Sequence, residues 1–246
     1  MNWEYFARSE IGLRRRRNED AVLTLPDARL YAVADGMGGH AAGDVASALA
    51  LATLAAAFPG PPSPRIRATT LARRLAAAVA EAHAALLTQA RERPAQFGMG
   101  TTLTALATLV AEPACVIAHV GDSRAYRLRH GKLLQLTHDH TWVQAQVDDG
   151  ILTPLQAASH PYRNVLARVL GGVGEPGRAD FVTADCEPGD LFLLCTDGLS
   201  GVLEPADLEA SLRPDLPLAS LADRLTQTTL LRGAPDNFTL VLLRPQ

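Results

Sequence analysis

The stretch Leu30-Tyr31-Ala32-Val33-Ala34-Asp35-Gly36-Met37-Gly38-Gly39-His40 decides the fold, because an apolar run ends there on one carboxylate among glycines. The run predicts a buried strand, and Asp35-Gly36 predicts a tight corner where that strand stops. Such a corner holds a side chain rigidly and leaves it accessible, so Asp35 is the first candidate functional residue. A plain strand followed by an Asp-Gly turn is the structural alternative.

Three further apolar segments carry an aspartate at one end. They are Phe192–Thr196 before Asp197, Val116–Val120 before Gly121-Asp122, and Phe238–Leu243 after Asp236-Asn237. Only Asp122 has a basic residue beside it, Arg124. If these ends converge, the carboxylates repel one another in a partly desolvated site unless cations neutralise them. Oxygen ligands without a cysteine or histidine cluster select magnesium or manganese over zinc.

Length and composition indicate one globular domain over residues 1–246, since 48% of the residues are hydrophobic and no linker interrupts the chain. The net charge of -3 argues against a nucleic-acid binder. An odd number of cysteines, two of them in apolar strand-like runs, indicates reduced thiols and a cytoplasmic location. The N-terminus lacks a secretory signal, and the apolar window Val45–Phe58 is too short to span a membrane. We expect a monomer.

Consecutive strand patterns favour a sandwich of antiparallel sheets over a parallel doubly wound fold. The strands expected in the middle of the chain are Thr101–Val110, Cys115–Val120, and a hairpin formed by Arg124–Leu128 and Lys132–Leu136. Helices are expected from Asp44 to Phe58, over Leu71–Arg93 and Val143–Asp149, and over Leu208–Arg232 despite two prolines. The long irregular segment Gly150–Gly174 is typical of a lid or a substrate-contacting flap.

Two polar clusters allow two interpretations each. Four consecutive arginines, Arg14–Arg17, run into Asn18-Glu19-Asp20 and form either a solvated surface patch or a phosphate-binding fork beside a metal. In Thr137-His138-Asp139-His140-Thr141, two histidines flank an aspartate as in some metal sites. We favour Thr137 and Asp139 as cap or turn residues before the next helix. His83 is interpreted as a helix histidine with a structural partner.

Taken together, the motifs resemble those of the metal-dependent type-2C (PPM family) Ser/Thr protein phosphatases, in particular the compact bacterial type. In family order they are Arg15 with Asn18-Glu19-Asp20, Asp35-Gly36-Met37-Gly38-Gly39-His40, Gly100-Thr101-Thr102, Gly121-Asp122-Ser123-Arg124, Asp197-Gly198 and Asp236-Asn237. The resemblance implies an α+β fold, a four-layer α-β-β-α sandwich with two central antiparallel β-sheets flanked by helices.

The resemblance also implies a binuclear Mn²⁺ or Mg²⁺ centre. By it, Asp35 bridges two ions, the Gly36 carbonyl helps to hold one, and Asp197 with Asp236 completes that ion's ligands. Glu19 supports the second ion, and Asp122 joins Asp197 at a third, weaker one. Arg15 matches the phosphate-binding arginine.

The implied reaction is hydrolysis of phosphoserine and phosphothreonine by a metal-activated water, without a phosphoenzyme. Met37 stands where eukaryotic members have a histidine proposed as general acid, and methionine cannot donate a proton. The flap corresponds to residues 142–168, with His160 and Arg163 expected to contact substrate.

The partners implied are phosphorylated proteins, among them a bacterial Ser/Thr kinase and its substrates. One alternative is a catalytically weak phosphoprotein-binding module of the same fold. Another is a serine esterase, because Gly121-Asp122-Ser123 matches a Gly-Asp-Ser motif. That alternative is disfavoured because the last histidine, His160, lies far from the C-terminus, where such enzymes carry theirs.

Overall fold

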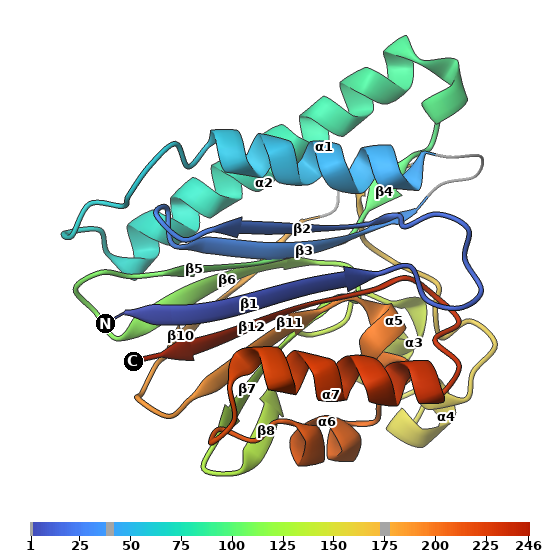
Figure 1. Ribbon diagram of the computed structural model, residues 1–246. Helices are drawn as coiled ribbons and strands as arrows, with labels where there is room; N and C mark the ends of the chain where they lie inside the picture. The colour runs from blue at the N-terminus through green and yellow to red at the C-terminus, as the bar shows by residue number, and fades with distance from the viewer. Residues whose placement is uncertain (1, 38–41, 173–177) are drawn as a thin grey trace.

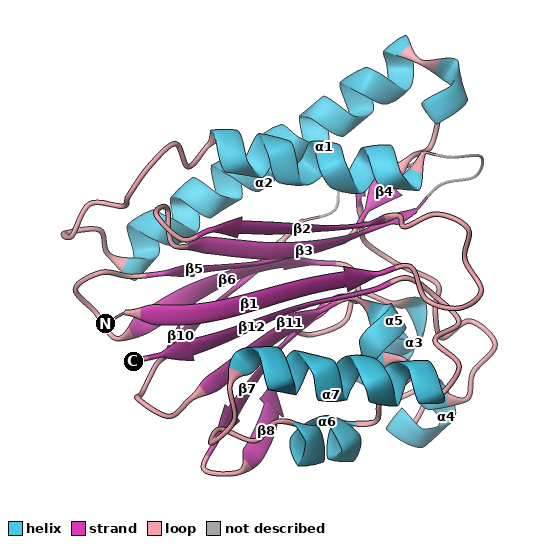
Figure 2. Cartoon of the chain, viewed as in Figure 1, coloured by secondary structure: helices cyan, strands magenta, loops and turns pink. Residues whose placement is uncertain are grey.

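The computed structural model describes residues 2–37, 42–172 and 178–246. Two antiparallel sheets lie face to face, and helices cover both outer faces (Figures 1 and 2). The expected four-layer α-β-β-α sandwich is therefore confirmed. The motif residues 38–40 and the end of the irregular segment, residues 173–174, lie outside the described residues.

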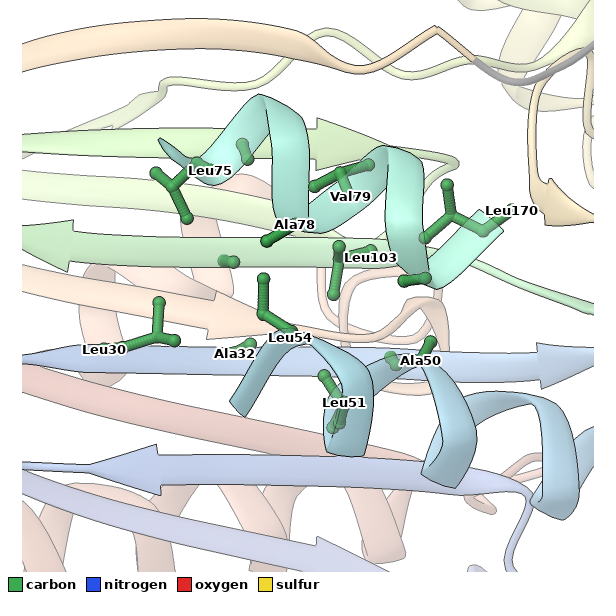
Figure 3. Close-up of a cluster of buried hydrophobic side chains, with 14 of the residues drawn as sticks. Leu30, Ala32, Ala50, Leu51, Leu54, Leu75, Ala78, Val79, Leu103 and Leu170 are labelled. Atoms are coloured by element: carbon green, nitrogen blue, oxygen red, sulfur yellow. The ribbon is translucent and has the colours of Figure 1, made fainter. Parts of the chain in front are cut away.

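The seven-stranded sheet has the order β10-β6-β5-β3-β4-β9, with β2 paired to β3. Its strands are β2 (Asp20–Leu25), β3 (Leu30–Met37), β4 (Gly100–Thr101), β5 (Leu103–Thr108), β6 (Ala114–Val120), β9 (Leu170–Gly171) and β10 (Asp180–Asp185). Helices α1 (Gly43–Ala56) and α2 (Ala68–Glu92) cover its outer face, and η1 (Pro94–Gln96) follows α2. Leu54, Leu75 and Leu103 lie in the core between helices and sheet (Figure 3).

The five-stranded sheet has the order β1-β12-β11-β7-β8. Its strands are β1 (Trp3–Glu10), β7 (Arg124–Arg129), β8 (Lys132–Gln135), β11 (Leu191–Cys195) and β12 (Phe238–Pro245). Helices α5 (Asp197–Ser200), α6 (Pro205–Ser211) and α7 (Leu218–Leu231) pack on its outer face, where Leu221 and Leu225 are fully buried.

A third core fills the space between the two sheets. Tyr31 and Val33 of β3 lie in it with Phe192 and Leu194 of β11. Because side chains alternate along a strand, Leu30 and Ala32 of β3 join the helix-covered core instead. The same alternation assigns Asp35 to the row of Tyr31 and Val33, so its carboxylate lies at the end of the space between the sheets.

Several expected boundaries were wrong. Strand β3 does not stop at Asp35 but continues to Met37, because Gly36 and Met37 pair with β4. The strand expected over Thr101–Val110 is divided into β4 and β5, which flank Thr102. The helix expected over Leu208–Arg232 is two helices, α6 and α7, since Pro214 and Pro217 lie between them and proline cannot donate the helical hydrogen bond.

The irregular segment contains more structure than expected. Helices α3 (Trp142–Asp148) and α4 (Pro154–Ala158) lie in the flap, and β9 closes it on β4. Within α2, His83 is satisfied as expected, because its Nδ1 accepts a hydrogen bond of 3.0 Å from the Gly171 N–H. The three cysteines are buried and unpaired.

The described part of the chain contains no helix with the length and apolar character needed to cross a bilayer.

Candidate metal centre

A cavity of about 300 Å³ opens where the two sheets end. It is lined by Arg15, Glu19, Asp35, Gly36, Met37, Thr102, Asp122, Asn164, Leu166, Asp197 and Asp236. The structure therefore brings together residues from seven separate segments of the chain, including every residue expected to hold a metal ion and the arginine expected to hold phosphate.

Thr102 fixes the position of Asp35 on β3. The Asp35 N–H donates to Thr102 Oγ1 and the Thr102 N–H donates to the Asp35 carbonyl, both at 2.9 Å. Thr102 Oγ1 also lies 2.7 Å from Ser123 Oγ, on the loop that carries Asp122. The Gly100-Thr101-Thr102 motif thus connects two of the carboxylate-bearing segments.

Gly36 stands where three segments meet. Its N–H donates to the Glu19 carbonyl at 3.1 Å, and the same carbonyl accepts 2.6 Å from Ser47 Oγ on α1. A Cβ added to Gly36 would lie 1.9 Å from the carbonyl oxygen of Gly43. Any side chain here would therefore push the start of α1 away from Glu19 and the cavity.

The Asn237 amide organises the opposite wall. Its Oδ1 accepts from the Glu19 N–H at 2.9 Å, while its Nδ2 donates to the carbonyls of Ile11 at 2.9 Å and Arg17 at 2.8 Å. One buried amide thereby fixes the backbone of Glu19 and of the arginine-rich loop beside the neighbouring Asp236. The sequence motif included Asn237, but no role for it was predicted.

Four aspartates in and beside the cavity, Asp20, Asp35, Asp122 and Asp197, are buried close to one another, and burial raises the pKa of each. Burial and the charges of Asp20, Asp197 and Asp122 raise the pKa of Asp35 well above its usual range. Burial, followed by repulsion from Asp197 and Asp139, raises the pKa of Asp122 to about 8. Burial also raises the pKa of Asp20, to about 7, and one of its oxygens, Oδ1, is buried without a hydrogen-bond partner.

Two arginines near the cavity have partners that the sequence did not indicate. Arg15 Nη2 pairs with Asp236 Oδ2 at 2.5 Å, so the expected phosphate ligand contacts an expected metal ligand. Arg124 does not pair with Asp122: its guanidinium binds Asp139, with Nη2 to Oδ2 at 2.6 Å. Asp122 therefore has no ion pair with any residue that the structure describes.

The segment Thr137–Thr141 supports the Asp122 loop. The expected capping role of Thr137 and Asp139 was wrong, since Thr141 caps α3 and accepts from the Gln144 N–H at 3.1 Å. His140 clamps Gly121: its N–H donates to the Gly121 carbonyl at 2.7 Å and its Nδ1 accepts from the Gly121 N–H at 3.1 Å.

The flap reaches the cavity through Asn164, which follows Arg163 in the part of the flap expected to contact substrate, and through Leu166, which was not expected there. Its base is fastened by the bond from the Trp142 N–H to the Val165 carbonyl at 2.7 Å. His160 and Arg163 are not among the lining residues. The His160 ring instead packs on Trp142, with ring centroids 5.2 Å apart.

The donor set fits magnesium or manganese. Five of the residues that line the cavity carry carboxylates and none is a histidine or cysteine, and the mutual repulsion of such carboxylates is what a divalent cation relieves. Among residues 2–37, 42–172 and 178–246, no three acidic, histidine or cysteine side chains close on one point as the ligands of a single ion.

Comparison with known proteins gives the family. The family model described as Protein phosphatase 2C matches residues 14–236. The chain is 44% identical over 239 residues to the serine/threonine protein phosphatase PstP of Mycobacterium tuberculosis, covering 97% of this chain. The chain belongs to the protein phosphatase 2C family.

Solved structures agree with this assignment. A crystal structure of the M. tuberculosis phosphatase PstP/Ppp superposes with a TM-score of 0.90 and 40% identity, and covers all of both chains. A structure of the PstP catalytic domain in complex with two manganese ions superposes with a TM-score of 0.84 at 39% identity, covering 98% of this chain and 97% of that one. The chain spans 44% of the length of the curated PstP sequence.

Proposed function

We propose that this chain is a protein serine/threonine phosphatase dependent on Mn²⁺ or Mg²⁺, with residues 1–246 as one catalytic domain. The observation that carries the proposal is the shared cavity, where four aspartates from different segments meet beside the Arg15 guanidinium. The manganese ions of PstP, a relative at 39–44% identity, support the choice of cofactor.

Two divalent ions bound in the cavity, with a weaker third, would supply positive charge to the phosphoryl oxygens and acidify a water for attack on phosphorus. Asp35 and the Gly36 carbonyl would help to hold both main ions. Asp197 and Asp236 would hold the first ion, Glu19 would support the second, and Asp122 would join Asp197 at the third.

Arg15 is the residue that binds the substrate phosphate. Its guanidinium already lies on Asp236, so it needs only a small displacement to share its fork between that carboxylate and a phosphoryl oxygen. Met37 lines the cavity but has no proton to donate, so the departing serine or threonine oxygen takes its proton from water within the cavity. In the flap, His160 and Arg163 contact the substrate's polypeptide.

The physiological substrates in this proposal are phosphorylated proteins, including a bacterial Ser/Thr kinase and its targets, and the enzyme acts as a cytoplasmic monomer. The net charge of -3 supports a protein rather than a nucleic-acid substrate.

The test is hydrolysis of p-nitrophenyl phosphate and of a phosphothreonine peptide, with Mn²⁺, with Mg²⁺, and with EDTA. We expect release of p-nitrophenol and phosphate only with a divalent ion. Metal-independent ester hydrolysis would instead favour the esterase alternative. Tight binding of the phosphopeptide without any turnover in Mn²⁺ would favour the binding module.

A further inference from the structure

Three of the four consecutive arginines have no role in the centre described above. We call residues 14–17 the arginine loop; it connects β1 to β2 at the cavity end of the molecule (Figure 1). Arg15 pairs with Asp236, whereas Arg14, Arg16 and Arg17 are exposed. The guanidinium groups of these three make no ion pair or hydrogen bond with any other residue that the structure describes.

The arginine loop is held firmly at both ends. The Asn237 amide binds the carbonyls of Ile11 and Arg17, and the Leu13 N–H donates to the Ala234 carbonyl at 2.9 Å. Gly12 has φ 74°, and a Cβ added there would lie 2.1 Å from the Asp236 carbonyl oxygen. The backbone beneath the arginines is therefore packed on the segment that carries Asp236, so the side chains of this loop extend from a fixed backbone next to Arg15, which lines the cavity.

Four adjacent cations repel one another, and only Arg15 has a carboxylate to offset this. The chain as a whole is acidic, so the run is not part of a generally basic surface. The guanidinium fork matches carboxylate and phosphate oxygens in a bidentate way. The unpaired arginines are therefore available to an anionic ligand that reaches the cavity from outside.

We propose that Arg14, Arg16 and Arg17 select protein substrates that carry a second anionic group, a carboxylate or a phosphate, within about four residues of the phosphoresidue being hydrolysed. The inference rests on the proposed function, in which Arg15 holds the scissile phosphate. Neighbouring residues of the loop lie about 3.8 Å apart, and an extended peptide advances about 3.3 Å per residue. An arginine side chain then reaches a substrate residue one to about four positions away.

The experiment compares three phosphothreonine peptides of equal length. One has neutral flanks, one has two glutamates within three residues of the phosphothreonine, and one has a non-hydrolysable phosphonate residue two positions away. Each exposed pair contributes modestly, so we expect kcat/KM of either anionic peptide to exceed that of the neutral peptide by about tenfold at low salt. The ratio should shrink as salt screens the charges.

The variant R14Q/R16Q/R17Q keeps Arg15 and should lower this ratio to between about one and two, mainly through KM. The matched control is R65Q/R67Q/R73Q, which removes three exposed arginines around the start of α2, at the opposite end of the molecule (Figure 1). The control should keep the wild-type ratio. If only the phosphonate peptide is preferred over the neutral peptide, the selected substrates are doubly phosphorylated. If the phosphonate and glutamate peptides are preferred equally, the selected substrates are acidic.

A wild-type ratio near one, or a ratio that the loop variant leaves unchanged, overturns the inference while the proposed function stands. If no peptide is hydrolysed, the proposed function fails. The inference is then decided by fluorescence anisotropy, with the same peptides labelled and the Asp35→Asn protein in Mn²⁺. The inference is supported if the two anionic peptides bind more tightly than the neutral peptide and the R14Q/R16Q/R17Q substitutions abolish this difference. Equal binding of the three peptides contradicts the inference.

Discussion

The two ends of the space between the sheets are opposite in chemistry, although the same strands build both. In the middle and at one end, Tyr31 and Val33 of β3 pack against Phe192 and Leu194 of β11, all buried. At the other end, two residues beyond Val33, the next side chain of the same row is Asp35. Asp197 follows β11 at the same end.

The difference shows how a packed core becomes a reactive site. Because side chains alternate along a strand, Asp35 lies on the same face of β3 as the buried Tyr31 and Val33. Its carboxylate is therefore held rigidly in an environment of low dielectric constant. The cost is burial of charged groups and repulsion among neighbouring carboxylates, which together raise the pKa values of Asp35 and Asp122. The core end stabilises the protein, and the carboxylate end concentrates negative charge that a divalent cation would offset.

The largest expected effect comes from removing the charge of Asp35. The variant Asp35→Asn keeps the size of the side chain but weakens the hold on both ions, so kcat/KM for p-nitrophenyl phosphate in Mn²⁺ should fall about 10²- to 10³-fold. Thermal unfolding provides the control: the metal-free variant should melt at or above the wild-type temperature, because a repelling charge is gone. Full activity of this variant would contradict the two-ion proposal.

The core end should respond in the opposite way. Leu194 is fully buried and pairs with Ala125 and Val241 on both sides, so Leu194→Ala should lower the free energy of unfolding by about 3 kcal/mol. Its kcat/KM should stay within about twofold of wild type below the melting temperature. The matched control, Leu134→Ala, changes a half-exposed leucine of β8 and should cost less than about 0.5 kcal/mol in urea unfolding.

Sequence reasoning predicted the composition of the site better than its geometry. Apolar runs ending in aspartate indicated Asp35, Asp122, Asp197 and Asp236, because hydrophobic periodicity and turn residues are local signals. Whether those ends converge depends on which strands pair, and no spacing in the chain encodes that pairing.

The errors have physical causes of the same kind. The pairing of Gly36 and Met37 with β4 extends β3 beyond the glycine that was expected to end it. Arg124 stands two residues from Asp122, but its guanidinium binds Asp139, a contact that closeness in the sequence did not indicate. Asn237 and His140 were given no role, since their hydrogen bonds join segments that are separated in the chain.

His119 lies beside the boundary between the two ends and predicts how stability depends on pH. Burial, followed by the charge of the neighbouring His140, lowers its pKa to about 4. The folded pKa lies below the unfolded value of about 6.5, so its stabilising contribution is complete above pH 6.5 and is lost as the pH falls toward 4. At pH 5 the expected loss is about 2 kcal/mol relative to pH 7.5.

The measurement is urea unfolding in EDTA at pH 7.5 and pH 5, in wild type and in His119→Gln, which removes the titration while keeping a polar group beside Thr104. The drop in stability between the two pH values should be about 2 kcal/mol smaller in the variant. Equal drops in both proteins would mean that His119 does not titrate across this range.

The smallest expected effect tests whether the acidic end is under strain without its ions. The pKa of Asp122 is raised to about 8, above its ordinary 3.8, so this carboxyl favours folding at low pH and opposes it as the pH rises toward 8. Asp122→Asn should therefore stabilise the metal-free protein at pH 8 by only about 1 kcal/mol, because water in the cavity weakens the repulsion that the substitution removes. The substitution should have no effect on stability at pH 4. In saturating Mn²⁺ the order should reverse, because the wild type then gains a ligand that the variant lacks. A variant less stable than wild type in EDTA at pH 8 would show that Asp122 is not repelled by its neighbours, and that the contrast between the two ends is structural rather than electrostatic.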